Sequence, residues 1–508
     1  MSETFQHFFQ AQRRRVQGTL VLLSALAVAG CGSNYRPVTN PIIPSGPAQL
    51  PSAYAFVVSA PSASVQGLGT VVDFAGDTVM ATAPIGPTPA GYTMNSGGSQ
   101  AWTLNADGTV SNIPISTNLQ QKLVQFSTLS PYTGIDPVVN LYSGSVGLYA
   151  LDVQANQVDV LTGSPDAFKL VVPVDQSPVT MVGVALAQRY YAIAQNIPYL
   201  TQITLDGKTV DGGAACNIDP YSATIPNGTA DAIETATYSV SAHITVGPCP
   251  VYAVGSLSSK RVFVLNRGGD SVSVINSQIN AIDSCTPFNN QNGQLVTCHP
   301  NLPLTPASGL PHAGPVYAEY NQATQELVVA NYDGNTISII DASLDEYGND
   351  SPTFGTTYTV PVGNNPASVT VLADGSRAYV ANQSDGTVSV VNMISHSVEK
   401  TLAVNGHPRT VVSIQDSLYG KVYVVSPDSP YVTIIRTDQD IVGTSILVSG
   451  NAVDVRTTSP DAVSTNPNTV SRLPGAGQPC NLPPADFTAA GATVTVANCR
   501  YQDPTLLP

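Results

Sequence analysis

Five residues whose side chains can bind a metal ion or a small anion stand beside a proline that recurs along the chain: Asp136, His312, Asn365, His407 and Arg409. Three of them directly precede such a proline, one lies three residues before it, and one follows it. Carboxylate, amide and imidazole groups ligate metals, and guanidinium groups bind anions. This chemistry requires the five side chains to meet around one centre, which we call the channel mouth. The favoured alternative is that they cap turns, the default role of polar residues at such places.

The sequence lacks the common catalytic and cofactor-binding motifs. Gly207-Lys208-Thr209 ends like a phosphate-binding loop, but Gln202 stands where the first glycine of that motif belongs. There is no G-x-S-x-G, no H-E-x-x-H and no C-x-x-C-H. The acidic segment 341–350 lacks the alternating oxygen ligands of a calcium loop. We therefore expect no catalytic residue, no cofactor and no bound metal, and a non-enzymatic protein is the favoured hypothesis.

The elements that must position these residues are short strands, most evident from Asn365 to Asn405. The strands predicted there are Val369–Leu372, Arg377–Asn382, Thr387–Asn392 and Ser397–Val404. They are rich in Val, Ala and Tyr, which suit a pleated, half-buried surface. Asp374-Gly375 and Asp385-Gly386 predict tight turns between them, because glycine accepts a positive φ. One small sheet with two apolar faces is not stable alone, so it needs neighbours stacked on it.

The same pattern recurs along the chain. In the reference unit, 16 residues separate the opening Pro366 from Asn382, which ends the second strand. Four other pairs have this separation, one pair is a residue closer, and one is two residues farther apart: Pro89–Asn105, Pro178–Ala194, Pro250–Asn266 and Pro315–Asn331, then Pro137–Asp152 and Pro408–Ser426. A recurring four-stranded unit of about 42–50 residues is typical of a β-propeller blade.

The run Tyr379-Val-Ala-Asn382, followed by Asp385-Gly-Thr-Val-Ser-Val-Val-Asn392, resembles the YVTN-type β-propeller repeat. The resemblance covers roughly residues 53–456 and is strongest in the three units from Pro250 to Asn405. It implies an all-β fold of four-stranded antiparallel blades around a central channel, often in a bacterial or archaeal cell envelope. It does not imply one activity, because this fold hosts many.

The two ends of the repeat region complement each other. Tyr54–Ser59, Gly69–Phe74 and Thr78–Ile85 match the second, third and fourth strands of a unit that has no first strand. Asn451–Val455 matches a first strand with nothing after it. Joining the two ends would close the ring and remove the exposed strand edges that invite aggregation. The seven proline-opened units and this split unit make eight blades, whereas the resembling family usually has seven, so both counts stay open.

Two units carry insertions, expected around Asp206–Thr237 and Asn280–Leu310. Loops of this size on a ring usually carry specificity. Apart from Cys31, the cysteines are Cys216, Cys249, Cys285, Cys298, Cys480 and Cys499. An even number in an exported chain predicts disulfides, and sequential pairing is the simplest of many arrangements. A cysteine metal site is disfavoured, because the sequence has no C-x-x-C and no pair with zinc-ligand spacing.

The N-terminus has the pattern of a bacterial lipoprotein. Residues 1–30 read as a signal peptide, with Arg13–Arg15 before the apolar run Leu20–Ala29. The run ends in Val28-Ala-Gly-Cys31, which resembles a lipobox and implies cleavage before Cys31 and lipidation of its thiol. Residues 31–52 hold five prolines and read as an extended tether, while 53–456 is the expected propeller. Residues 457–508 read as a C-terminal extension stapled by Cys480 and Cys499.

The charge of the chain argues against one class of partner. Its 19 basic and 34 acidic residues give a formal charge of −15, whereas nucleic-acid binding needs a basic face. We expect contact with the membrane through the lipid anchor and with a protein or other component of the cell envelope, at the outer membrane and facing the periplasm or the surface. The favoured function is a binding or scaffold module. The alternatives are a lactonase-like hydrolase or metal-dependent redox enzyme at the channel mouth, and a structural component of a surface layer.

Overall fold

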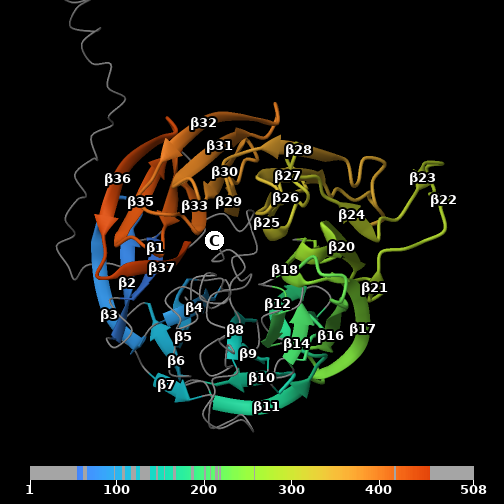
Figure 1. The fold of residues 1–508 in the computed structure, drawn as a ribbon, viewed down its shortest axis with the longest axis horizontal. Helices are drawn as coiled ribbons and strands as arrows, with labels where there is room; N and C mark the ends of the chain where they lie inside the picture. Colours follow the sequence, from blue (N-terminus) through green and yellow to red (C-terminus); the bar gives the residue numbers. More distant parts are fainter. Residues whose placement is uncertain are drawn as a thin grey trace, which may run out of the picture. The chain divides into compact units, whose positions relative to one another are not determined.

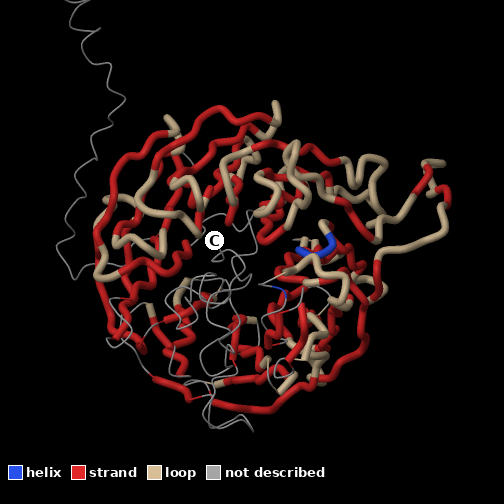
Figure 2. Tube along the Cα trace, in the orientation of Figure 1, coloured by secondary structure: helices blue, strands red, loops and turns tan. Residues whose placement is uncertain are grey.

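In the computed structural model the chain forms eight antiparallel sheets arranged around a common axis (Figures 1 and 2). The structure describes residues 54–457 except 61–65, 88, 96–97, 106–108, 116–121, 126–137, 145–146, 154, 164–166, 185–187, 199–201, 206–207, 212–215, 217–218, 257 and 417–418. Among the described residues each of these eight sheets has four strands, one gains a fifth, and two further sheets are two-stranded hairpins. The predicted all-β propeller is confirmed, and of the two open blade counts the structure has eight.

We number the blades from the first that is continuous in sequence. Blade 1 contains β4 (Pro89–Met94), β5 (Gln100–Asn105), β6 (Thr109–Pro114) and β7 (Lys122–Gln125). Blade 2 contains β8 (Val138–Ser143), β9 (Leu148–Asp152), β10 (Gln157–Thr162) and β11 (Ala167–Pro173). Blade 3 contains β12 (Pro178–Val184), β13 (Arg189–Ala194), β16 (Asn227–Glu234) and β17 (Ser239–Pro248). Blade 4 contains β18 (Pro250–Gly255), β19 (Arg261–Asn266), β20 (Ser271–Asn276) and β21 (Ala281–Ile282), and β24 (Asn301–Pro303) also pairs with β20.

The remaining blades follow the same order. Blade 5 contains β25 (Pro315–Asn321), β26 (Glu326–Asn331), β27 (Thr336–Asp341) and β28 (Thr357–Pro361). Blade 6 contains β29 (Pro366–Val371), β30 (Arg377–Asn382), β31 (Thr387–Asn392) and β32 (Ser397–Ala403). Blade 7 contains β33 (Thr410–Asp416), β34 (Tyr419–Val425), β35 (Tyr431–Arg436) and β36 (Ile441–Leu447). Blade 8 contains β37 (Asn451–Thr457), β1 (Tyr54–Ala60), β2 (Gln66–Asp73) and β3 (Val79–Pro87).

The ring is closed by strands from opposite ends of the sequence, as predicted. β37 pairs antiparallel with β1, so the innermost strand of blade 8 comes from the C-terminal side and its other three strands from the N-terminal side. The innermost strands contact one another in the order β4, β8, β12, β18, β25, β29, β33, β37 and back to β4 (Figure 1). Closure places a neighbouring blade against both faces of every sheet, so no apolar sheet face is left open.

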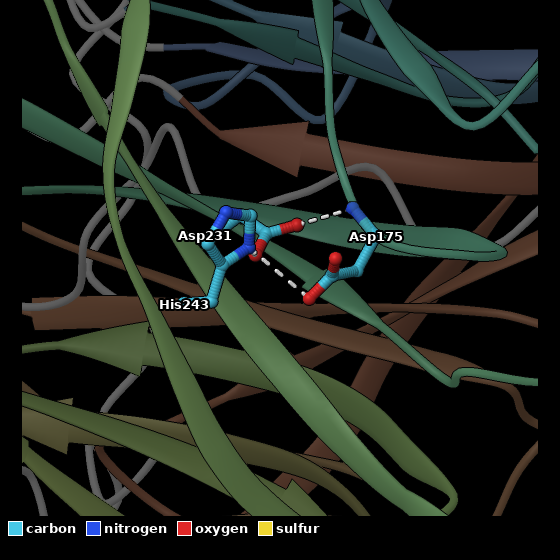
Figure 3. A group of neighbouring side chains, drawn as sticks. All are labelled: Asp175, Asp231 and His243. Carbon is cyan, nitrogen blue, oxygen red and sulfur yellow. Dashed lines mark hydrogen bonds and ion pairs between the residues drawn. The ribbon is translucent and has the colours of Figure 1, made fainter.

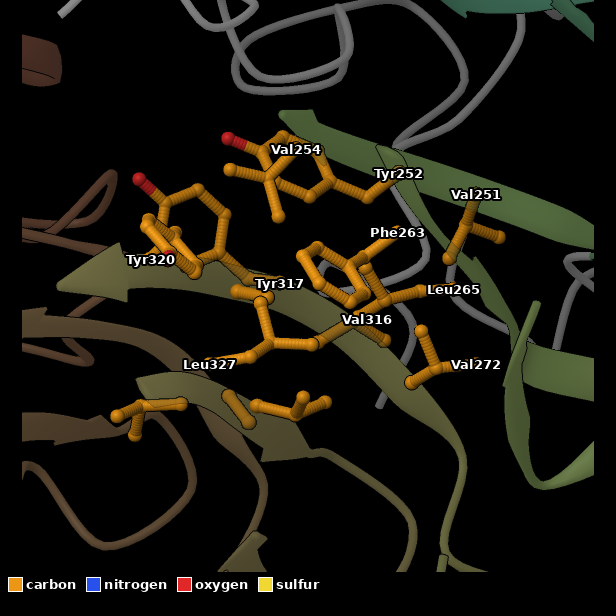
Figure 4. Close-up of a cluster of buried hydrophobic side chains, with 14 of the residues drawn as sticks. Val251, Tyr252, Val254, Phe263, Leu265, Val272, Val316, Tyr317, Tyr320 and Leu327 are labelled. Carbon is orange, nitrogen blue, oxygen red and sulfur yellow. The ribbon is translucent and has the colours of Figure 1, made fainter. Parts of the chain in front are cut away.

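The core lies between neighbouring blades rather than at the centre of the ring. Central strands are buried along their whole length because both faces of each sheet meet another blade, as in β19 and β29. Between blades 4 and 5, Phe263 and Tyr320 stack with ring centroids 6.1 Å apart, and Tyr252 approaches Tyr317 at 4.7 Å (Figure 4). Burying one large apolar side chain contributes about 1.5–3 kcal/mol, so these contacts between blades are the main stabilising term.

The turns and insertions refine the expected boundaries. Gly375 and Gly386 have positive φ values of 69° and 62°, as the tight-turn prediction requires. The insertion in blade 3 lies between β13 and β16 and includes the hairpin of β14 (Gln202–Leu205) and β15 (Lys208–Asp211). The boundary predicted at Thr237 was too far along the chain, because β16 is the third strand of the blade and not part of the insertion.

Several predicted features lie outside the described residues. These are the signal peptide, the tether with Cys31, the candidate ligand Asp136, and the C-terminal extension with Cys480 and Cys499. Within the described part of the chain, no helix is long and apolar enough to span a membrane.

Candidate functional site

The channel-mouth residues that the structure describes are each held by a neighbouring turn or buried. His312 Nδ1 lies 2.8 Å from an oxygen of Asp270. Asn365 adopts a positive φ of 53° and its side-chain amide donates to the Tyr332 carbonyl at 3.1 Å. His407 is bound to a neighbouring turn, because its backbone N–H donates to the carboxylate of Asp428 at 2.8 Å and its Nδ1 lies 2.6 Å from the other oxygen of that carboxylate.

Arg409, the fifth candidate, is fully buried at the start of blade 7. Its backbone N–H donates to the Val425 carbonyl at 3.0 Å, which fixes the chain where blade 7 begins. For His312, Asn365 and His407 these contacts agree with a turn-capping role, since each side chain bonds to a residue outside the candidate set.

The insertion in blade 3 is bound to residues of blades 4 and 5. Tyr221 donates from its hydroxyl to Asp333 at 2.7 Å, and its ring stacks on His312 with centroids 3.5 Å apart. The buried Arg267, in the short 3-10 helix η3 (Arg267–Gly269), binds both oxygens of Asp333 at 2.8 and 2.9 Å. We call the set Tyr221, Arg267, Asp270, His312 and Asp333 the clasp.

A disulfide between Cys216 and Cys249 also ties this insertion to the start of blade 4. A second disulfide joins Cys285 to Cys298, so two of the three sequential pairings are present and the third lies outside the described residues. Each disulfide contributes about 2–4 kcal/mol, chiefly by restricting the unfolded chain. Disulfides persist in oxidising compartments, so the protein belongs outside the cytoplasm.

The Cys285–Cys298 disulfide closes the base of a projecting hairpin, residues 285–298, which we call the arm. It carries β22 (Phe288–Asn289) and β23 (Leu295–Val296) and stands out beyond the rim of the ring (Figure 1). Directly beneath it lies a buried charged network in which Arg261 Nη2 reaches Asp350 at 2.8 Å and Asp283 at 3.4 Å. His299, next to the disulfide, places Nδ1 2.8 Å from the second oxygen of Asp350.

A repeated packing unit defines what an ordinary blade looks like. In blades 1, 4, 5 and 6 the asparagine that ends the second strand donates to a serine on the third strand, at 2.9–3.0 Å. These pairs are Asn105–Ser111, Asn266–Ser273, Asn331–Ser338 and Asn382–Ser389. In three of these blades a glycine stands three residues before the opening proline. A Cβ added to Gly86, Gly247 or Gly363 would lie 2.1–2.6 Å from the same asparagine, so only glycine fits there.

Blade 3 departs from this unit at all three positions. The glycine place holds Asp175, the asparagine place holds Ala194, and the serine place holds Asp231. Alanine leaves room that asparagine would fill, and the two carboxylates occupy the region that it frees. A fourth residue completes the group, because Asp231 on β16 is directly opposite His243 on β17 in the strand register.

These residues form a compact cluster (Figure 3). His243 Nδ1 lies 2.7 Å from Asp231 Oδ1 and 3.2 Å from Asp175 Oδ2. The second oxygen of Asp231 accepts the backbone N–H of Asp175 at 2.6 Å. Among the residues that the structure describes, this is the one group of three or more His, Cys, Asp or Glu side chains whose ligand atoms converge, all within 4.8 Å. We call it the blade 3 cluster.

The cluster is buried on one side and open on the other. The Asp231 side chain is 0% exposed, whereas the His243 side chain is 56% exposed. Burial raises the pKa of Asp231 to about 6. Partial burial opposes protonation of His243, but the carboxylates of Asp231 and Asp175 outweigh it and raise the pKa of the imidazole. The cluster is therefore a small acidic group that favours a bound cation or proton.

Blade 7 has a neutral counterpart at the same three register positions. Asn405 stands three residues before Pro408, as Asp175 does before Pro178. Its side-chain amide donates to Thr433 at 3.1 Å and to Ser445 at 2.8 Å. Thr433 and Ser445 are opposite each other in the strand register, as Asp231 and His243 are. The positions therefore converge in an uncharged blade too, and what distinguishes blade 3 is the choice of side chains.

The sequence predictions did not include the blade 3 cluster. They followed the residue immediately before each proline, whereas Asp175 lies two positions earlier. The long insertion between β13 and β16 also hid Asp231, since it displaced the third strand from its usual offset. An alignment of the glycine, asparagine and serine positions across all units would have shown that blade 3 has a different residue at each of the three.

Comparisons with known proteins support the fold. No protein-family model matches the chain, and a search of curated proteins finds no match. Two structures of AztD from Citrobacter koseri are similar in fold. The first, at 12% identity and a TM-score of 0.51, covers 80% of this chain and 97% of its own. The second, described as apo AztD, has 14% identity and a TM-score of 0.50 and covers 82% of this chain and 98% of its own. At this identity the likeness concerns the fold alone.

Proposed function

We propose that this chain is a lipid-anchored binding module of the cell envelope, built on a YVTN-type ring, and that it acts by presenting a fixed surface to a partner rather than by catalysis. The observation that carries this proposal is the construction of the two insertions. The ring is closed without them, yet each is fixed by a disulfide and by buried charged contacts. A surface that is rigid before binding loses less conformational entropy when a partner docks.

The arm is the part of this surface best placed to meet a partner. Phe288 and Leu295 on its two strands are 43% and 61% exposed, which puts two large apolar side chains on one small projecting element. Asn292 in the turn of the arm donates to Glu346 at 2.8 Å, which connects the arm to the loop between β27 and β28 of blade 5. The disulfide and the buried network hold the base, so the apolar residues of the arm are held in a fixed position beyond the rim (Figure 1).

The anchor completes the proposal. The Arg run, the apolar segment and Cys31 form the lipobox pattern, and the five prolines of residues 31–52 suit an extended tether. Two or more acyl chains give stable attachment, whereas one gives marginal binding. The oxidising location that the two disulfides indicate agrees with export. The intact mass of the chain purified from membranes checks the anchor: it should begin at an acylated Cys31, and a mass that includes residues 1–30 would contradict it.

We expect the double variant F288S/L295S to lose partner capture. Wild-type and variant chains, each purified from membranes in detergent, are cross-linked to envelope extract, and captured proteins are quantified by mass spectrometry. The variant should recover its specific partner at least about tenfold less well, because truncating a central apolar contact typically costs more than 1 kcal/mol per residue.

The matched control is I394S, which removes another exposed apolar side chain, 83% exposed, from the turn between β31 and β32. It should capture the same partner as the wild type. Equal capture by all three chains would show that the arm does not contact the partner. No specific capture by the wild type would contradict the binding function itself.

A further inference from the structure

We propose that the blade 3 cluster binds one divalent transition-metal ion through Asp175, Asp231 and His243. This departs from the sequence-based expectation of no bound metal, and it is independent of the partner-binding proposal because the cluster and the arm lie in different blades. Two observations carry it. Three ligand atoms of the right chemistry converge, and the glycine, asparagine and serine of the ordinary packing unit are all replaced by other residues in blade 3.

The geometry suits a single ion. Metal–oxygen and metal–nitrogen bonds to zinc are about 2.0–2.2 Å, which puts the ligand atoms of one ion roughly 3–4.4 Å from one another. The ligand atoms of the cluster lie within 4.8 Å of one another, slightly beyond this range, and His243 Nδ1 lies 2.7 Å from Asp231 Oδ1, slightly short of it, so small side-chain shifts would accommodate one ion. The backbone N–H of Asp175 holds one oxygen of Asp231 and thereby directs the other toward His243. The buried carboxylate is thus oriented before any ion arrives, as a second contact to a ligand group does in known metal sites.

The joint replacement argues against an incidental ion pair. Three departures from the glycine, asparagine and serine unit fall on contacting positions of the same blade, and the fourth residue is an imidazole directly across from Asp231. The neutral trio Asn405, Thr433 and Ser445 shows that hydrogen bonding alone satisfies these positions. The Asp175 side chain is 34% exposed and that of Asp231 is fully buried, and two carboxylates placed side by side repel each other unless a cation lies between them. Blade 3 therefore contains more negative charge than its packing needs.

The ligand types indicate the class of ion. Imidazole together with carboxylate suits zinc and its neighbours in the first transition row, whereas magnesium and calcium prefer oxygen ligands alone. Three protein ligands leave a fourth position, and the 56% exposure of the His243 side chain places that position toward solvent. An ion held in this way exchanges readily and remains open to a further ligand.

Titration of the purified full chain with Zn²⁺ by calorimetry tests the proposal. The wild type should bind one ion per chain, and H243A should bind at least about 100-fold more weakly, because the loss of a group that merely orients a ligand already costs 10–100-fold. D231N should have the same effect. Because Asp231 is fully buried, D231N also changes contacts inside the blade, so H243A, at a half-exposed position, is the decisive variant. The midpoint of thermal unfolding should rise with Zn²⁺ in the wild type and stay unchanged in H243A.

The control is H396A, which removes an imidazole that stacks on the Tyr358 ring at 3.7 Å and lies outside the cluster. It should bind Zn²⁺ as the wild type does. Binding that is equal in the wild type and H243A would place any zinc elsewhere and overturn the proposal. The absence of binding by the wild type would overturn it as well.

Discussion

A chain that lacks residues 451–508 should lose the cooperative unfolding transition of the propeller. This deletion removes β37, the innermost strand of blade 8. It exposes the edge of β1 and opens the apolar clusters to which Ala452, Val453 and Val455 belong. We expect a chain that is aggregated or partly unfolded, because the loss of a whole buried strand exceeds the 5–15 kcal/mol by which a folded protein is usually stable.

The matched control is a chain that lacks only residues 458–508 and therefore keeps β37. It should unfold in one transition, followed by circular dichroism and calorimetry, and remain monomeric by light scattering. If the longer deletion also unfolds cooperatively, with a midpoint close to that of the control, the ring does not depend on its closing strand and the reading of blade 8 is wrong.

The second large effect is expected at the base of the arm, where D350A should destabilise the protein by about 3–5 kcal/mol. Asp350 accepts from Arg261 at 2.8 Å and contacts His299 at 2.8 Å. Arg261 has a side chain that is only 1% exposed. Without Asp350 the guanidinium keeps its hydrogen bond to the Lys260 carbonyl at 3.1 Å and the longer, 3.4 Å contact with Asp283. It stays buried with its closest anionic partner removed, and breaking a buried ion pair in this way is strongly destabilising.

Urea unfolding measures the free energy of unfolding of the wild type and D350A, provided that both depend on urea concentration with the same slope. D438A provides the comparison. Asp438 binds Arg436 at 2.7 Å, but the two side chains are 33% and 32% exposed, so solvent screens the pair. We expect D438A to cost less than about 1 kcal/mol. A D350A cost no larger than that of D438A would show that the network under the arm is not a structural support.

The sequence predicted the ring because each blade repeats the same local signals. The strands around Tyr379-Val-Ala-Asn382, the Asp-Gly turns and the recurring proline depend on neighbours within a few residues, and the strands observed in blade 6 agree with the predicted ones to within three residues at each end. Ring closure was predictable for a similar reason, since the N-terminal end of the repeat region matches the second to fourth strands of a blade and the C-terminal end matches the first.

The candidate site was not predictable in the same way. Asp175 lies in the connection between β11 and β12, Asp231 on β16 and His243 on β17. The three meet only when β16 pairs with β17 and the connection from blade 2 packs against them. The insertion before β16 removed the spacing cue that would have aligned Asp231 with the serines of other blades. Likewise, nothing local in the sequence shows that Tyr221 would reach Asp333 in a different blade. Such contacts depend on the ring geometry, not on local propensity.

The proposed metal site lies in blade 3, where the residues depart from the common packing unit. The most direct test is the variant D175G/A194N/D231S, which rebuilds the ordinary glycine, asparagine and serine unit in blade 3 and keeps His243. Its visible absorption on titration with Co²⁺ is compared with that of the wild type. The account predicts one Co²⁺ per wild-type chain and none for the rebuilt blade, with similar thermal midpoints for both apo proteins. Equal Co²⁺ spectra for the two chains, or none for either, would contradict it.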